Sequence, residues 1–245
     1  MVQKTEINIE TDIEIKGIIP STFLDWDGKV VSTIYLPRCN FRCPFCHNWE
    51  LIETPDKFET VQLNELDRHL RENRDFLDGV CITGGEPTIY KGLANLIKHI
   101  KELGFLVKLD TNGTQTKALE KLIDNSLLDY IAMDIKAPLN ERYFELAGTS
   151  LNLEHIKLSI DLIMNSAPDY EFRTTVVPRM LDQNDITIIA EQLAGAKKYV
   201  LQQFVPDHSR DEQLRELKPY DRETMESFQK ICEERITKVS LRGVK

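Results

Sequence analysis

Three of the five cysteines in the chain lie close together, at Cys39, Cys43 and Cys46, with Phe45 directly before the third. Three thiolates on so short a loop can bind one compact metal centre. A structural zinc site takes four protein ligands, and a ferredoxin-type iron–sulfur cluster takes four cysteines. Three cysteines therefore leave one coordination position open, and an open position on a metal is where chemistry takes place. A zinc site completed by His47 is the alternative, although ligation by two adjacent residues makes one tetrahedron awkward.

The composition limits the classes of partner and the compartment. The chain has 245 residues and a formal net charge of −9, so its surface repels phosphate backbones and nucleic-acid binding is not expected. It contains no run of about 18 apolar residues that could cross a membrane. The first residues include no apolar signal region, so we expect a cytoplasmic protein. Cys81 and Cys232 lie in apolar contexts, and this cysteine usage indicates metal or catalytic chemistry in a reducing compartment.

Hydrophobic patterning predicts six strands that alternate with helices. The strands are expected at 30–36, 79–83, 105–110, 128–134, 171–177 and 198–204, and 239–242 is expected as an edge strand. The helices are expected near 60–74, 89–102, 115–125, 140–165, 183–195 and 221–236, with a polar loop over 205–219. Alternating isoleucines within 7–19 predict a short N-terminal strand or hairpin.

This alternation predicts an α/β fold, because strands joined by helical crossovers form a parallel sheet. The pattern contains no linker, so we expect one domain over 1–245. Six units fit an open (β/α)6 barrel better than the complete barrel of eight. A doubly wound sheet is the alternative fold, which periodicity alone does not separate from the open barrel.

The active site of a parallel α/β fold lies at the carboxyl ends of its strands. Every predicted strand here ends in polar or glycine-rich residues. They are the cysteine loop, Gly84-Gly85-Glu86-Pro87, Asp110-Thr111-Asn112-Gly113, Asp134-Ile135-Lys136, Arg173 with Thr175, and Gln202-Gln203. We therefore expect one composite site that faces the cysteine loop. Taken singly, each aspartate could cap a helix, Lys136 could be a surface lysine and Arg173 could form an ordinary salt bridge.

The glycine pair at 84 and 85 predicts a place where a polar ligand approaches the backbone closely, because glycine leaves backbone groups bare. Many turns between a strand and a helix need a glycine for their geometry alone. The carboxylate of Glu86 directly after the pair favours a ligand site over a simple turn.

The run from Cys39 to Cys46 matches the pattern Cys-x3-Cys-x-aromatic-Cys and resembles the cluster motif of the radical S-adenosylmethionine (SAM) enzymes. Cys46-His47-Asn48 is similar to the subset that activates glycyl-radical enzymes, such as pyruvate formate-lyase activating enzyme. The runs 109–113, 132–138, 173–175 and 201–204 resemble activating proteins of anaerobic ribonucleoside-triphosphate reductase. The resemblance covers residues 17–204 and leaves 205–245 as a C-terminal extension.

The resemblance implies a partial (β/α)6 barrel with a 4Fe–4S cluster on Cys39, Cys43 and Cys46 and an open iron that chelates SAM. It implies that the methionyl amino group meets the turn at Gly84, Gly85, Glu86 and Pro87, and that Phe45 lies beside the adenine. The remaining implied SAM contacts are Asp110, Asn112, Asp134, Ile135, Lys136, Arg173 and Gln203. The resemblance also implies a monovalent cation held by Asp110 and Asp134.

The implied activity is that of an oxidoreductase. Reductive cleavage of SAM yields methionine and a 5′-deoxyadenosyl radical, which removes a hydrogen atom from the Cα of one glycine in a glycyl-radical enzyme. Anaerobic ribonucleoside-triphosphate reductase is the expected partner, with reduced flavodoxin or ferredoxin as the electron donor.

Three positions depart from the family pattern. Asp27-Gly28 stands in the upstream turn where the family often has Pro-Gly. Arg38 stands where the family usually has glycine, and Gln202-Gln203 lies near the place of a SAM-contacting histidine in the pyruvate formate-lyase activators. Two other functions remain open at this point. One is a radical SAM synthase that acts on a small molecule, and the other is a zinc-binding interaction protein.

Overall fold

The computed structural model describes residues 13–244. Its centre is one sheet of eight strands in chain order from β1 to β8. The strands are β1 (Gly17–Thr22), β2 (Val31–Leu36), β3 (Gly79–Gly84), β4 (Leu106–Thr111), β5 (Tyr130–Asp134), β6 (Tyr170–Val176), β7 (Lys198–Gln203) and β8 (Lys238–Arg242). Strands β2 to β8 run parallel, whereas β1 pairs with β2 antiparallel. Because β1 and β8 are the two ends of the sheet, the barrel is open between them.

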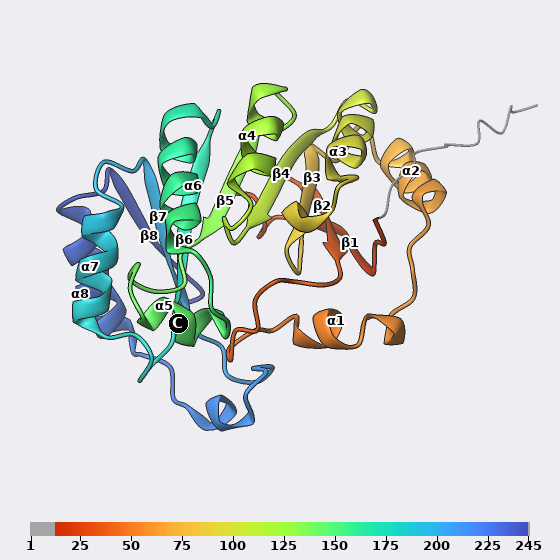
Figure 1. Cartoon of the computed structure of the whole chain (residues 1–245). Coiled ribbons are helices and arrows are strands. Elements are labelled where there is room, and N and C mark those ends of the chain that lie inside the picture. The colour runs from red at the N-terminus through yellow and green to blue at the C-terminus, as the bar shows by residue number, and fades with distance from the viewer. Residues whose placement is uncertain (1–12, 245) are drawn as a thin grey trace, which may run out of the picture.

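The α-helices of the described residues are α1 (Trp49–Glu53), α2 (Leu63–Glu72), α3 (Leu93–Glu102), α4 (Thr116–Asp124), α5 (Arg142–Ala147), α6 (Leu153–Ser166), α7 (Gln183–Gln192) and α8 (Arg222–Glu233). Short 3-10 helices occupy Pro55–Lys57, Pro87–Ile89 and Glu212–Glu216. Most helices pack along the outer face of the curved sheet, and α1 and α5 lie with the loops at one edge of it (Figure 1). In residues 13–244, no helix is both long enough and apolar enough to cross a membrane.

The predicted open barrel is confirmed by β2 to β7 and their helices. The expected edge strand at 239–242 is β8, which pairs with β7 from Lys198↔Lys238 to Gln202↔Arg242. The region 140–165, where one or two helices are expected, holds the two helices α5 and α6, because Gly148 adopts a left-handed φ of +64° and ends α5. An N-terminal hairpin exists, but it joins β1 to β2, and the part of 7–19 before residue 13 lies outside the described residues.

Side chains on the two faces of the strands meet different surroundings, because successive residues of a strand point to opposite sides. Outward-facing residues such as Leu109, Ile131 and Phe172 belong to the large apolar core that the helices cover. A second, small apolar cluster joins Trp26 of the β1–β2 loop to Val31, Cys81, Tyr130 and Ala132 on the inner face. Charged residues such as Lys108, Asp110, Asp134 and Arg173 take other inward positions, and these contribute to the site.

Candidate active site

A cavity of about 400 Å³ lies at the carboxyl ends of the parallel strands. Its lining includes most residues that the sequence singled out: Cys39, Cys43, Phe45, Cys46, Gly84, Gly85, Glu86, Asp110, Asn112, Asp134, Lys136, Arg173 and Gln203. Two predicted residues do not line it. Pro87 begins the short helix behind the glycine turn, and buried Ile135 accepts a hydrogen bond from Thr174 on β6 through its backbone oxygen.

The glycine turn after β3 donates backbone hydrogen bonds to the segment that leads into the cysteine loop. The amide of Gly85 donates to the oxygen of Leu36 at 2.8 Å, and the amide of Glu86 donates to the oxygen of Arg38 at 3.0 Å. A Cβ on Gly85 would lie 1.8 Å from the Arg38 oxygen, so only glycine allows this contact. Arg38 itself has a left-handed φ of +61°. A side chain costs roughly 1–2 kcal/mol in that conformation, which explains why glycine is the usual residue there.

A second support for the cysteine loop comes from the end of α5, which sequence reasoning missed. The amide of Arg42 donates to the oxygen of Ala147 at 2.8 Å, and the thiol of Cys43 lies 3.9 Å from the same oxygen. A Cβ on Gly148 would lie 2.0 Å from the oxygen of Arg42. The only sequence signal for this contact is a glycine after a short helix, which is common at helix ends.

The three thiols are protonated in the absence of a metal. Burial raises the pKa of Cys39 to about 12 and the pKa of Cys43 to about 11, and it also raises the pKa of Cys46. Metals bind the thiolate, so loading this loop releases protons. Within residues 13–244, no three His, Cys, Asp or Glu side chains are grouped to hold a single metal ion. His47, the fourth ligand of the zinc alternative, instead places Nε2 2.7 Å from the oxygen of Val205.

The carboxylate of Glu86 joins the ends of β3 and β4 through hydrogen bonds that it accepts. Its donors are the amide and hydroxyl of Thr88, the hydroxyl of Thr111 at 2.8 Å and the amide of Asn112 at 2.6 Å. The residue is 1% exposed, and burial raises the pKa of its carboxyl. Glu86 therefore fixes the shape of the two strand ends.

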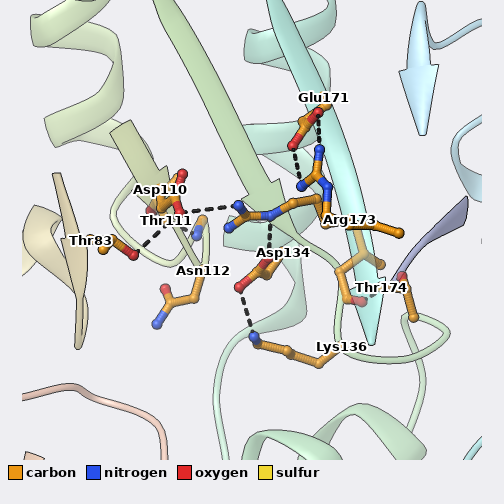
Figure 2. A network of polar contacts seen from close by, with 12 residues as sticks. Thr83, Asp110, Thr111, Asn112, Asp134, Lys136, Glu171, Arg173 and Thr174 are labelled. Carbon is orange, nitrogen blue, oxygen red and sulfur yellow. Dashed lines mark hydrogen bonds and ion pairs between the residues drawn. The ribbon is translucent and has the colours of Figure 1, made fainter. Parts of the chain in front are cut away.

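An ion network lies at the carboxyl ends of β4, β5 and β6 (Figure 2), and its residues Asp110, Asp134 and Arg173 line the cavity. The guanidinium of Arg173 contacts Asp110 at 3.0 Å and Asp134 at 2.9 Å. Lys108 contacts Asp110 at 2.6 Å, and Lys136 contacts Asp134 at 2.9 Å. Two of these cations, Lys136 and Arg173, line the cavity, whereas Lys108 is buried behind Asp110. An anionic group of a ligand can approach Lys136 or Arg173 from the cavity.

The network fixes the charge states of its carboxyls. Burial acts to raise the pKa of Asp110 and of Asp134, but Arg173 and the neighbouring lysine of each outweigh it and hold both below the ordinary value. Lys136 also places its ammonium 5.9 Å from the centre of the Phe45 ring, a cation–π contact. The strand-end residues and the cysteine loop therefore meet directly at Lys136.

A second set of ion pairs joins the two open ends of the barrel. Asp27, in the loop between β1 and β2, contacts Lys198 on β7 at 2.7 Å and Arg242 on β8 at 3.6 Å. Buried Glu171 accepts from Lys198 at 2.9 Å and from Arg242 at 3.1 Å. Sequence reasoning assigned no role to these residues, because the partners lie up to 171 positions apart.

The wall at β7 and β8 contributes Gln202, Gln203, Arg242 and Gly243 to the cavity lining. The side-chain amide of Gln203 donates to the backbone oxygen of Tyr220 at 3.0 Å. Its Oε1 is buried and accepts no hydrogen bond from residues 13–244. The C-terminal strand β8 thus contributes to the cavity lining, although the sequence resemblance left 205–245 as an extension outside the site.

Comparison with known proteins places the site in a family. Residues 33–190 match the model of the "Radical SAM superfamily". A "Putative glycyl-radical enzyme activating enzyme" of Methanocaldococcus jannaschii is 33% identical over 237 residues, which is 94% of this chain and 96% of that protein. A "Probable GTP 3',8-cyclase" of Saccharolobus islandicus is 31% identical over 128 residues, which is 51% of this chain and 41% of that protein.

Among solved structures, Streptococcus suis SuiB shares the fold, with a TM-score of 0.66 and 17% identity over 87% of this chain and 49% of SuiB. The family implies a 4Fe–4S cluster and SAM. The residues present fit these groups, since three thiols, a glycine turn and the cations Lys136 and Arg173 line one cavity. The chain therefore belongs to the radical SAM superfamily and is homologous to the activating enzymes of glycyl-radical enzymes.

Proposed function

We propose that this protein activates a glycyl-radical enzyme by removing a hydrogen atom from the Cα of one glycine. One observation carries the proposal. The three cysteines of the loop line the same cavity as the glycine turn and the Asp134–Lys136 strand end. When bound, the cluster and SAM supply the radical chemistry, in which one electron breaks the C5′–S bond and leaves methionine and a 5′-deoxyadenosyl radical.

The residues of this chain bind and orient in that reaction. Cys39, Cys43 and Cys46 would hold the cluster, and the bare backbone of Gly84 and Gly85 would receive the amino group of SAM. Lys136 would meet an anionic group of SAM, since its ammonium lies in the cavity lining and next to Phe45. The remaining lining residues, Asp110, Asn112, Asp134, Arg173 and Gln203, would set the shape and charge of the pocket.

The size of the cavity favours a protein substrate. Pockets for one drug-sized ligand span roughly 300–1,000 Å³. A volume of about 400 Å³ lies near the lower end, so it has room for one nucleoside-sized ligand. A second substrate therefore reaches the site as a thin segment, such as a peptide loop that presents a glycine. The relative that matches nearly the full chain also bears the name of an activating enzyme.

Within this class, anaerobic ribonucleoside-triphosphate reductase is our proposed partner, on the strand-end resemblances at 109–113 and 132–138. The electron would come from reduced flavodoxin or ferredoxin, in cytoplasm without oxygen. Our proposal includes no monovalent cation, because Arg173 already lies between Asp110 and Asp134. Activity in potassium, sodium and ammonium buffers of equal ionic strength should therefore be the same.

The second candidate is a radical SAM synthase for a small molecule. The similarity to a "Probable GTP 3',8-cyclase" over half of this chain favours it. Under this alternative, SAM cleavage would be coupled to a nucleotide-sized substrate. It would leave the glycine of any partner protein without a radical.

The test uses anaerobically reconstituted protein, dithionite and SAM, with a glycyl-radical enzyme deuterated at glycine Cα. We expect 5′-deoxyadenosine that carries deuterium, together with a glycyl radical signal in electron paramagnetic resonance (EPR). Cys43→Ala should abolish both products, whereas Cys232→Ala is the matched control, because Cys232 on α8 does not line the cavity. Formation of 5′-deoxyadenosine that carries no deuterium from any glycyl-radical enzyme would favour the small-molecule alternative.

A further inference from the structure

Tyr143 on α5 buries a hydroxyl that makes no hydrogen bond with the described residues. The residue is 0% exposed, and its hydroxyl oxygen has no partner in the described part of the chain. Two other tyrosines are as deeply buried, but both use their hydroxyls. The oxygen of Tyr170 accepts from a backbone amide at 3.0 Å, and the hydroxyl of Tyr199 donates to Oγ1 of Thr174 at 2.7 Å. A buried hydroxyl without a partner is costly, so the one on Tyr143 needs a physical reason.

Tyr143 packs against the cysteine loop. It stands four residues before Ala147 in α5, so the two residues share one face of that helix. At the end of α5, the thiol of Cys43 lies 3.9 Å from the backbone oxygen of Ala147. The Tyr143 ring meets the ring of Phe41 edge-on, with 6.4 Å between the ring centres. Helix α5 therefore contacts the loop at Phe41 and at Cys43.

Cys43 is also among the groups that act on the phenol of Tyr143. Burial raises the pKa of Tyr143, and the other groups that act on this pKa are Lys136, Cys43 and Asp134. The backbone amide of Lys136 is one of these influences, although it does not reach hydrogen-bond geometry with the hydroxyl. Lys136 and Asp134 already pair with each other at 2.9 Å. The sulfur of Cys43 is therefore the group near this hydroxyl that could still accept its proton in a hydrogen bond.

Metal binding changes what the Cys43 sulfur can accept. In the metal-free protein Cys43 is a thiol, which can donate weakly to the oxygen of Ala147. A thiolate that binds iron has no proton and only accepts hydrogen bonds. The oxygen of Ala147 cannot supply one, whereas the Tyr143 hydroxyl is a donor without an acceptor. The hydroxyl and the sulfur therefore complement each other in the metal-loaded protein.

We propose that the Tyr143 hydroxyl donates a hydrogen bond to the Cys43 thiolate when the cluster is bound, and that this bond raises the reduction potential of the cluster. The proposal rests on the proposed function for the presence of that cluster. Hydrogen bonds to the sulfurs tune the potential of an iron–sulfur cluster, because a donor stabilises the more negative, reduced state. Tyr143 acts through Cys43 and is thus a positioning residue.

Tyr143→Phe removes the hydroxyl and keeps the ring. In the metal-free protein the hydroxyl has no partner, so the midpoint of urea unfolding should stay equal or rise. In the reconstituted full chain without SAM, a redox titration followed by EPR should give a lower potential than in the wild type. At a fixed solution potential, the ratio of reduced to oxidised cluster should fall about tenfold, which is a shift of about 59 mV for one electron.

Tyr199→Phe is the matched control. It also removes one buried hydroxyl, but that hydroxyl already donates to Thr174, and Tyr199 does not line the cavity. The urea midpoint of its metal-free form should fall, and its cluster should keep the wild-type potential. The two variants should thus differ in both measurements.

A wild-type potential in Tyr143→Phe would overturn the proposal. So would a lower urea midpoint of the metal-free variant, since the hydroxyl would then have a partner before any metal binds. Equal shifts of potential in Tyr143→Phe and Tyr199→Phe would also count against it, because a general change of packing would explain both. The proposed function fails separately, when the wild-type protein holds the cluster but gives no 5′-deoxyadenosine from SAM.

Discussion

Replacing Arg173 with methionine tests whether the ion network holds the strand ends together. The side chain is 10% exposed and contacts two carboxylates on two other strands. Removing one partner of a buried ion pair typically costs 3–5 kcal/mol, because it leaves an uncompensated charge. Asp110 keeps Lys108 and Asp134 keeps Lys136, so we expect the lower end, about 3 kcal/mol.

Urea unfolding of the metal-free protein at pH 7, followed by circular dichroism, measures this loss as a lower midpoint. In the wild type, the cations hold the pKa of both carboxyls below the ordinary 3.8. The stabilisation that these ion pairs give the fold is therefore present above pH 3.8, and it is lost as the pH falls through the pKa values of the folded protein. In the variant, we expect burial to outweigh the one lysine left to each carboxyl and to raise the pKa of both Asp110 and Asp134. The variant should therefore gain relative stability as the pH falls from 7 towards 4.

Arg173→Met/Asp134→Asn is the matched double variant. The asparagine removes the charge that the arginine balanced, so the double variant should be more stable than Arg173→Met alone. A loss under 1 kcal/mol for Arg173→Met at pH 7, or a loss that the pH does not change, would refute this account of the network.

Two further substitutions test the supports of the site. Gly148→Ala should lower the iron content after reconstitution severalfold, because the added Cβ would clash with the oxygen of Arg42. Gly195→Ala is the control, because Gly195 also has a positive φ but its Cβ would meet only Met164 Cε at 3.8 Å, an ordinary contact, so this variant should load normally. Equal iron content in the two variants would contradict the support from α5. Asp27→Asn should lower the free energy of unfolding, measured in urea, by under about 1 kcal/mol, since the Asp27 side chain is 60% exposed and exposed ion pairs contribute little. A larger loss would mean that the stability of the barrel depends on the ion pairs that join its two open ends.

The sequence could predict those parts of the site that show as local patterns of residues. Cysteine spacing marked the loop, and the polar ends of apolar strands marked Asp110, Asp134 and Lys136 as members of one site. The parallel topology then predicts that these residues lie together, because it brings the carboxyl end of every strand to one edge of the sheet.

The parts that sequence could not predict depend on contacts between distant segments. Gly148 lies against the backbone oxygen of Arg42, which is more than a hundred residues away in the sequence. Only the folded chain shows that a Cβ at Gly148 would clash with this oxygen. From the sequence, Arg173 could contact either a ligand or an acidic residue in an ordinary salt bridge. The structure places it between two aspartates. Arg242 enters the cavity because β8 is a full strand of the sheet, which a short edge pattern does not reveal.

The most direct test of the central claim is EPR of the dithionite-reduced, reconstituted protein with and without SAM. In the proposed site, Cys39, Cys43 and Cys46 would supply three ligands to a cluster of four irons, which would leave one iron open to SAM. We predict a 4Fe–4S signal whose shape changes when SAM is added, and its loss in Cys43→Ala. One zinc per chain with no acid-labile sulfide, or a cluster signal that SAM leaves unchanged, would contradict the account.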